Sequence, residues 1–282
     1  MDLDLPGYAW DLLPFDQKPL DLYRAHFWHA EFSHEKRTPF AAIYTSLGCN
    51  FACDFCMINI VNRNNTDEVG VASDFSSMRF WSPEFIIKEF DKLISMGVRT
   101  IRIVDEMFLL NPKYYLPLCK ELAKRNKDDS LRIWSYSRID TVKRHEILKL
   151  VRSAGIKWLA LGIESGEKSV RLEVDKGKFE DVDVKKVINK VHEAGINVMA
   201  NYIYGLPGDT KETIEKNVSQ IDIQERERRL RGRDGEQKLS RSRRTERRSM
   251  KRDLCMVCGT TVYNIRLMAT HGAQNSHSNK YR

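Results

Sequence analysis

The sequence lacks any apolar run of the roughly 18 to 20 residues that a membrane span requires. Its N-terminus, MDLDLPGYAWDLLPF, lacks the basic stretch and apolar core of a signal peptide. Cysteine is also scarce, with six residues in a chain of 282. These absences indicate a cytoplasmic protein with no membrane association. In that compartment the cysteines stay reduced, and they are better suited to metal binding than to pairing.

An excess of positive charge is missing from most of the chain, although the net charge is +8. Residues 221–282 hold 16 Lys and Arg residues against 7 Asp and Glu residues, so the first 220 residues are nearly neutral. The net positive charge therefore lies in the C-terminal tail and gives no indication that the main body binds nucleic acid.

Three segments repeat one pattern, in which an amphipathic helix ends at a glycine and a β-branched apolar run follows. They are residues 95–104, 153–162 and 193–205, with Gly97, Gly155 and Gly195 at the helix ends. A glycine in this position typically adopts the left-handed conformation that caps a helix. Ser82 and Pro83 similarly predict the start of a helix whose apolar residues share one face. The pattern predicts alternating helices and strands.

Five strands are expected, near residues 40–46, 99–104, 131–135, 157–162 and 196–204. Short, almost continuously apolar strands that alternate with helices indicate a parallel sheet with helices outside it. The predicted fold class is therefore α/β, either a partial (βα) barrel or an open doubly wound sheet. In both architectures the active site lies at the carboxyl ends of the strands.

Cys49, Cys53 and Cys56 follow the first predicted strand at its carboxyl end. Thiolates are the usual ligands of iron–sulfur clusters, and three of them leave one iron of a cubane open for another ligand. Structural zinc sites prefer four protein ligands, so a set of three fits zinc less well. A zinc site completed by a distant histidine, or three unrelated thiols, are the alternatives. Cys119, on a predicted helix, is interpreted as a buried structural thiol.

The Cys-x3-Cys-x2-Cys spacing, with Phe55 before the last cysteine, resembles the cluster signature of the radical S-adenosylmethionine (SAM) superfamily. The resemblance extends from about Pro6 to Gln220. It implies a 4Fe–4S cluster on the three cysteines and bound SAM, which is cleaved reductively into methionine and a 5′-deoxyadenosyl radical. It also implies an electron donor such as flavodoxin or ferredoxin. Methyl transfer, methylthio transfer and rearrangement of an unknown substrate all remain open.

The same resemblance implies cofactor-binding residues at the ends of the later strands. Asp105 is preferred over Glu106 for the amino group of SAM, and Ser135 or Ser137 is expected to contact ribose or substrate. Glu164, in a Gly-Ile-Glu-Ser-Gly segment, is expected to accept hydrogen bonds from ribose. For Arg138 a structural ion pair is an equal alternative, and for Lys176, matched to the cofactor carboxylate, a surface lysine is nearly equal. The implied set is Asp105, Ser135, Arg138, Glu164 and Lys176.

The segments PGYAWDLLP, LYRAHFWHA and YTSLGCNFACDFC resemble the approach to the cluster in radical enzymes that also carry a cobalamin domain. No Asp-x-His-x-x-Gly segment for cobalamin occurs in the sequence. Cobalamin is therefore expected only if a missing domain supplies it. The sequence also enters its basic tail where the family has a sixth strand, so the barrel is expected to lack that strand.

The chain is accordingly expected to divide into a lead-in segment (1–36), a radical SAM core (37–220) and a basic, disordered tail (221–282). Within the tail, Cys255, Cys258, His271 and His277 have the spacing of a Cys2His2 zinc site. This predicts an alternative function: a nucleic-acid-binding protein that contacts phosphates through Arg229, Arg231, Arg243 and Arg244.

Overall fold

The computed structural model describes residues 6–13, 24–25, 37–51, 53, 55–58, 77–142, 146–174 and 182–218, with the backbone alone of 145 and 261–267. Across these ranges, no helix combines the length and the apolar character needed to cross a membrane.

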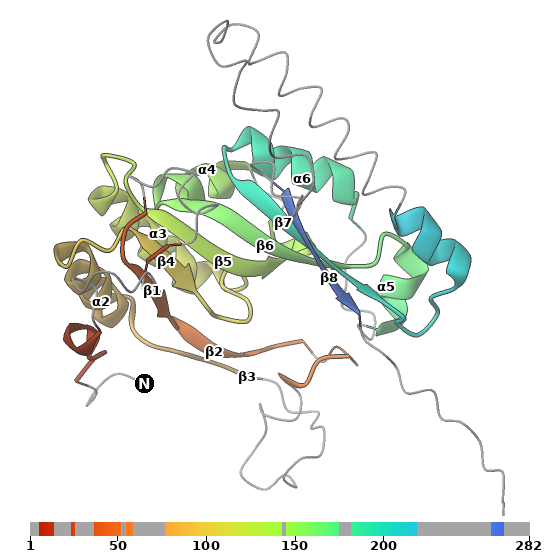
Figure 1. Ribbon diagram of the computed structural model, residues 1–282, viewed down its shortest axis with the longest axis horizontal. Coiled ribbons are helices and arrows are strands. Elements are labelled where there is room, and N and C mark those ends of the chain that lie inside the picture. Colours follow the sequence, from red (N-terminus) through yellow and green to blue (C-terminus); the bar gives the residue numbers. More distant parts are fainter. Residues whose placement is uncertain are drawn as a thin grey trace, which may run out of the picture.

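Six parallel strands form the central sheet, in the order β1-β4-β5-β6-β7-β8 (Figure 1). Their bounds are β1 Phe40–Ile43, β4 Thr100–Ile103, β5 Arg132–Arg138, β6 Ile156–Glu164, β7 Asn197–Tyr204 and β8 Thr261–Leu267. The order follows the chain, and β1 and β8 are the two edges of the sheet. The predicted α/β class with a parallel sheet is confirmed.

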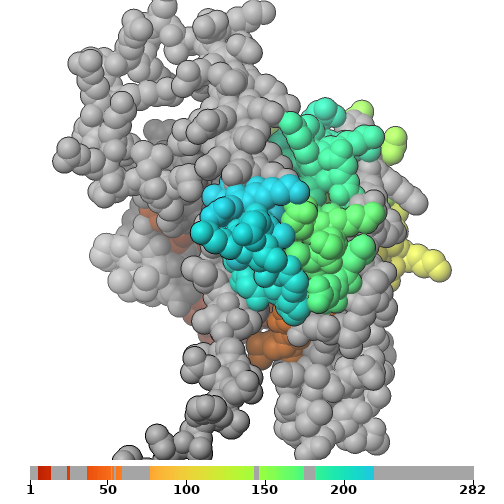
Figure 2. All heavy atoms as spheres, turned by 90° about the vertical axis from the view of Figure 1, so that its right-hand side faces the viewer, coloured from red at the N-terminus to blue at the C-terminus, as the bar shows by residue number. Residues whose placement is uncertain are grey.

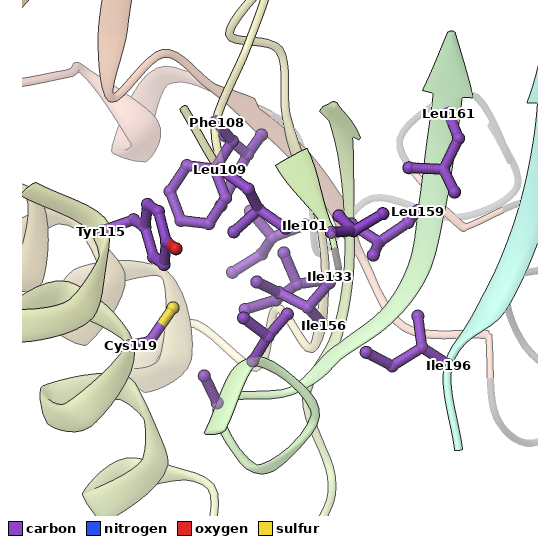
Figure 3. Packing of buried hydrophobic residues seen from close by; sticks show 14 of the residues in the cluster. Ile101, Phe108, Leu109, Tyr115, Cys119, Ile133, Ile156, Leu159, Leu161 and Ile196 are labelled. Carbon is purple, nitrogen blue, oxygen red and sulfur yellow. The ribbon is translucent and has the colours of Figure 1, made fainter. Parts of the chain in front are cut away.

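Helices connect these strands and cover one face of the sheet (Figure 1). The connecting helices are α2 Pro83–Ser95, α3 Pro112–Arg125, α4 His145–Ser153, α5 Lys168–Val174 and α6 Val184–Glu193, with short 3-10 turns at Trp10–Leu12 and Ile139–Thr141. The main core lies between the sheet and α2, α3, α4 and α6. Figure 3 shows Tyr115 and Cys119 of α3 directed toward Ile101 and Ile133 of the strands. Cys119 is fully buried, as a structural thiol should be.

The helix ends form as the local sequence predicts. The Ser82 hydroxyl accepts a hydrogen bond from the Phe85 amide at 3.1 Å, which satisfies one of the free donors at the start of α2. At the other ends, Gly97, Gly155 and Gly195 have φ values of 82°, 96° and 77°. Only glycine adopts this left-handed conformation without strain. The three predicted glycine caps are confirmed.

A two-stranded antiparallel hairpin, β2 (Ser46–Cys49) with β3 (Ser77–Phe80), lies outside the main sheet. The single strand expected over 40–46 is therefore wrong in detail, because β1 ends at Ile43 and a second strand begins at Ser46. The break lies at Thr45 and Ser46. The Thr45 amide and both side-chain hydroxyls donate hydrogen bonds to the carboxylate of Asp105. Cys49 consequently ends β2 rather than following the first parallel strand.

The sheet contains a sixth strand, and it comes from the segment expected to be tail. β8 runs parallel to β7 over seven register pairs, from Val198–Thr261 to Tyr204–Leu267. The expected absence of a sixth strand is therefore wrong, whereas the low order expected for the rest of the tail stays a prediction. Its sequence, TVYNIRL, is rich in β-branched and aromatic residues, which favour strands. This strand does not follow residues 210–220 directly, so its position in the sequence gives no sign that it pairs with β7.

Candidate functional site

The cysteine loop begins where β2 ends, beside the carboxyl ends of β4 and β5. Cys49 is buried, while Cys53 and Cys56 are partly exposed. The Cys56 amide donates to the Cys53 carbonyl at 3.0 Å, and the Phe51 amide donates to the Cys49 sulfur at 3.4 Å. Burial, followed by the neighbouring Cys56, raises the pKa of Cys49 to about 11. Cys49 therefore stays protonated until a bound cation compensates the negative charge of its thiolate.

The three thiols fit an iron–sulfur cluster better than a single metal ion. In the described ranges, no three side chains among His, Cys, Asp and Glu converge closely enough to hold one ion. A cubane does not require such convergence, because each thiolate binds a different iron. The donor set of Cys49, Cys53 and Cys56 is all sulfur, which is the ligand chemistry of these clusters.

Arg138, at the end of β5, connects the sheet to the cysteine loop. Its guanidinium carbon lies 3.6 Å from the centroid of the Phe51 ring, in a cation–π contact. The same guanidinium donates two hydrogen bonds to Asp140, at 2.7 and 2.5 Å, and both side chains are only 6% exposed. The structural ion pair considered for Arg138 is therefore present. Arg138 also acts to lower the pKa of Cys49.

Asp105 lies at the end of β4, as expected, but its carboxylate is fully buried. It accepts hydrogen bonds from the Thr45 amide at 2.6 Å, the Thr45 hydroxyl at 2.5 Å and the Ser46 hydroxyl at 2.7 Å. Burial raises the pKa of Asp105, and these hydrogen bonds act in the opposite direction. The carboxylate thus fixes the start of β2, just before the cluster loop.

Glu106, the next residue, is exposed and faces the cysteine loop. Its carboxylate accepts a hydrogen bond from the Gly48 backbone, and its charge acts to raise the pKa of Cys49. Partial burial, then the neighbouring Asp105, raises the pKa of Glu106 itself. Of the two acidic residues after β4, Glu106 is the one with a carboxylate accessible beside the cysteines.

Glu164 ends β6 in an unusual conformation. Its φ is 65°, the left-handed region that residues other than glycine rarely adopt. The pairing of β6 with β7 shifts register between Gly162 and Glu164. A Cβ atom on Gly162 would lie 2.5 Å from the Glu164 carboxylate oxygen. Gly162 therefore leaves the space into which the Glu164 side chain folds, and strain of this kind is common at ligand sites.

The loop after Glu164 is held by three buried polar side chains. Asn217 accepts from the Gly166 amide at 2.8 Å and donates to the Ser165 hydroxyl at 3.0 Å. The Arg171 guanidinium donates to the carbonyls of Ser165 and Gly166 at 2.7 and 2.9 Å. Ser165 and Asn217 are fully buried, and Arg171 is nearly so. This network fixes the backbone next to Glu164, and nothing in the local sequence pattern marks Arg171 or Asn217.

The far side of the cysteine loop contacts α5. Phe55 packs against Val170, Val174, Ile203 and Leu206, a small cluster separate from the main core. Figure 2 shows part of the cysteine loop at the surface below α5 and the segment that follows β7. After β7, the Asp209 carboxylate accepts from the amides of Gly205 and Leu206 at 3.0 and 3.2 Å. The expected Gly-x-Pro-Gly turn thus serves as scaffold.

Ser135 is not brought to this site. Ser135 lies within β5, which extends to Arg138 instead of ending at 135 as expected. Its side chain is fully buried on the opposite side of the strand from Trp134 and Tyr136. Ser137 is also buried, and its hydroxyl lies 2.7 Å from that of Thr141. Lys176, together with Arg229, Arg231, Arg243, Arg244, Cys255, Cys258, His271 and His277, lies outside the described residues.

Comparison with curated proteins finds partial relatives. The chain is 29% identical over 177 residues to an anaerobic magnesium-protoporphyrin IX monomethyl ester cyclase of Cereibacter sphaeroides, covering 60% of this chain and 26% of that protein. It is 30% identical over 178 residues to a hopanoid C-2 methylase of Rhodopseudomonas palustris, covering 62% of this chain and 31% of that protein. The chain thus spans under a third of the length of these two relatives.

Among solved structures, the radical S-adenosylmethionine methyltransferase TsrM from Kitasatospora setae superimposes with a TM-score of 0.56 at 21% identity. The match covers 66% of this chain and 34% of that one, and another structure of TsrM contains cobalamin and a [4Fe–4S] cluster. This likeness supports the fold. The sequence model of the Radical SAM superfamily matches residues 43–221, which include the cysteine loop and the strand ends described above. The chain therefore belongs to the radical SAM superfamily.

Proposed function

We propose that this chain holds a 4Fe–4S cluster on Cys49, Cys53 and Cys56, binds SAM beside it, and initiates radical chemistry on an organic substrate, with methyl transfer as the favoured outcome. Reduced cluster and SAM together supply a 5′-deoxyadenosyl radical that abstracts hydrogen. The observation that carries the proposal is the meeting of the cysteine loop with Glu106 and Arg138 at the carboxyl ends of β4 and β5.

The residues of the chain supply binding and positioning. Glu106 is proposed to pair with the ammonium group of SAM, in place of the fully occupied Asp105, because a carboxylate facing an ammonium forms a charge-assisted hydrogen bond. Glu164 is proposed to accept from the ribose hydroxyls. Arg138 holds the cysteine loop through Phe51 and places a cation near Cys49, which favours deprotonation of that thiol.

Methyl transfer is favoured because two of the matched proteins are named a methylase and a methyltransferase. Cobalamin, if it takes part, is proposed to come from a domain outside this sequence. An external electron donor of the flavodoxin or ferredoxin class is part of the same proposal.

The test is anaerobic reconstitution with iron and sulfide, followed by dithionite and SAM. The expected result is a brown protein with about four irons per chain, which forms 5′-deoxyadenosine and methionine. Cys53→Ala should lose colour and iron, whereas Cys119→Ala should retain both, because Cys119 is buried on α3. Iron retained by the Cys53 variant would contradict the cluster assignment.

A further inference from the structure

Arg102 projects from the face of the sheet opposite the main core. It alternates along β4 with Ile101 and Ile103, which are fully buried in the core on the helix side. Arg102 is in register with Trp134, and Trp134 is in register with Trp158. The next row on the same face contains Tyr136, Ala160 and Met199. These residues, Arg102, Trp134, Tyr136, Trp158, Ala160 and Met199, are called the Arg102 platform.

The guanidinium of Arg102 lies against two aromatic rings, and no residue in the described ranges supplies it with a counter-ion. Its central carbon lies 4.4 Å from the Trp134 ring centroid and 5.1 Å from that of Tyr136. Among the residues that the structure describes, no carboxylate pairs with Arg102, and its Nε is buried without a hydrogen-bond partner. By contrast, Arg125, Arg138 and Arg152 each pair with an aspartate. A partly buried, uncompensated cation is costly, and an anionic ligand would relieve that cost.

A second donor lies beside this cation. A terminal nitrogen of Arg102 donates to the hydroxyl of Tyr136. Because the Tyr136 oxygen accepts in that bond, its own hydrogen is available to donate, and within the described ranges no acceptor takes it. A fork of N–H groups with a phenol O–H matches the oxygens of a carboxylate or phosphate. The rings of Trp134 and Trp158, which are 8% and 7% exposed, lie in a small apolar cluster beside this cation, so the rest of such a molecule would contact flat apolar side chains.

The platform lies at a definite depth below the proposed site of radical formation. Arg102 is one residue before the end of β4, and Trp134, in register with it, is four residues, about 13 Å, before the end of β5. A substrate anchored at Arg102 would therefore extend toward the strand ends to reach the cysteine loop.

Resting on the function proposed above, we propose that the Arg102 platform binds the anionic group of the substrate, which is an organic acid or phosphate ester with a flat or apolar body. Recognition is a charge-assisted hydrogen bond from Arg102, supported by Tyr136. The class of substrate follows from this mode of recognition, whichever type of reaction the substrate then undergoes.

The test measures binding of three probes by calorimetry, first on protein without cluster: 4-phenylbutyrate, 4-phenylbutyl phosphate and the neutral 4-phenylbutyramide. At least one anion should bind ten-fold or more tightly than the amide. Whichever anion binds better distinguishes the carboxylate from the phosphate. Arg102→Gln should abolish the preference, and Arg102→Lys should retain part of it. The control Lys124→Gln, an exposed residue of α3, should leave the preference intact.

Equal binding of acid and amide, binding of no probe at millimolar concentration, or an anion preference that survives in folded Arg102→Gln would overturn the proposal. Circular dichroism establishes folding of the variants, and the charge-conserving Lys variant guards against a purely structural effect. Iron content and 5′-deoxyadenosine formation without substrate should be unchanged in the control Lys124→Gln. If wild-type protein fails to cleave SAM but binds the anions through Arg102, the proposed function fails and the binding site stands.

Discussion

The guanidinium of Arg138 lies 3.6 Å from the ring centroid of Phe51 while it forms a two-point ion pair with Asp140. One buried side chain thus joins the end of β5 to the loop that carries the cysteines. The geometry of the proposed cluster site therefore depends on a residue that is not itself a ligand.

Replacing Arg138 by Ala should destabilise the protein and impair cluster retention. The change leaves the buried Asp140 carboxylate without its partner, which typically costs about 3 to 5 kcal/mol. Urea unfolding monitored by circular dichroism gives the first effect, and iron per chain after reconstitution gives the second. Lys124→Gln removes an exposed ion pair and should change neither. A variant with unchanged unfolding midpoint would show that the ion pair is unimportant.

Gly162→Ala should reduce the affinity for SAM about ten-fold, equivalent to about 1.4 kcal/mol, with little loss of stability. The added Cβ would displace the Glu164 carboxylate, which is the flexible end of a side chain. The matched variant is Gly97→Ala, where nothing lies within 4 Å of the new Cβ but φ is +82°. Gly97→Ala should cost about 1 to 2 kcal/mol of stability and leave the affinity for SAM unchanged. Equilibrium dialysis and thermal unfolding separate the two effects; the opposite pattern would refute this account.

Asp105→Asn and Glu106→Gln should differ in kind. The side-chain NH2 group of an asparagine at position 105 would face the N–H and O–H donors of Thr45 and Ser46, and two donors cannot form a hydrogen bond. The protein should therefore lose about 2 to 4 kcal/mol of stability. Glu106 is exposed, so its variant should fold normally and bind SAM at least ten-fold more weakly. Unfolding curves and SAM titrations on both proteins test the distinction. Normal SAM affinity in Glu106→Gln would show that another residue binds the ammonium group of SAM.

The stability contributed by Asp129 should depend on pH at the acid end. Hydrogen bonding, chiefly from Arg152 and also from Lys157, lowers its pKa from 3.8 to about 2. Because the folded-state pKa is the lower one, the contribution is fully present above about pH 4 and is lost as the pH falls toward 2. The melting temperature of Asp129→Asn should therefore lie below that of wild type at pH 6, with the gap narrowing toward pH 2.5. A gap independent of pH would contradict the assignment.

Local signals in the sequence predicted much of this fold. The positive φ of Gly97, Gly155 and Gly195 and the Ser82 cap depend on neighbouring residues alone, so they could be identified without a structure. The same is true of the cysteine spacing that led to the family.

The choice between Asp105 and Glu106 could not be made in this way. It depends on Thr45 and Ser46, about sixty positions earlier, whose donors occupy the first carboxylate and leave the second accessible. The strand at Thr261–Leu267 was missed for a related reason, since its partner Val198–Tyr204 is distant along the chain. Both features follow from long-range contacts that have no local sequence signature.

The position of β8 also sets an order for synthesis. A ribosome completes β7 at Tyr204 well before it reaches Thr261, so for that interval the backbone donors and acceptors along one side of β7 have no strand to pair with. Unpaired strand edges are where nascent chains associate wrongly. For this protein the vulnerable period of biogenesis is the translation of residues 205–267: a pause there prolongs the exposure of the β7 edge, and a stop codon there would release a chain in which that edge stays open.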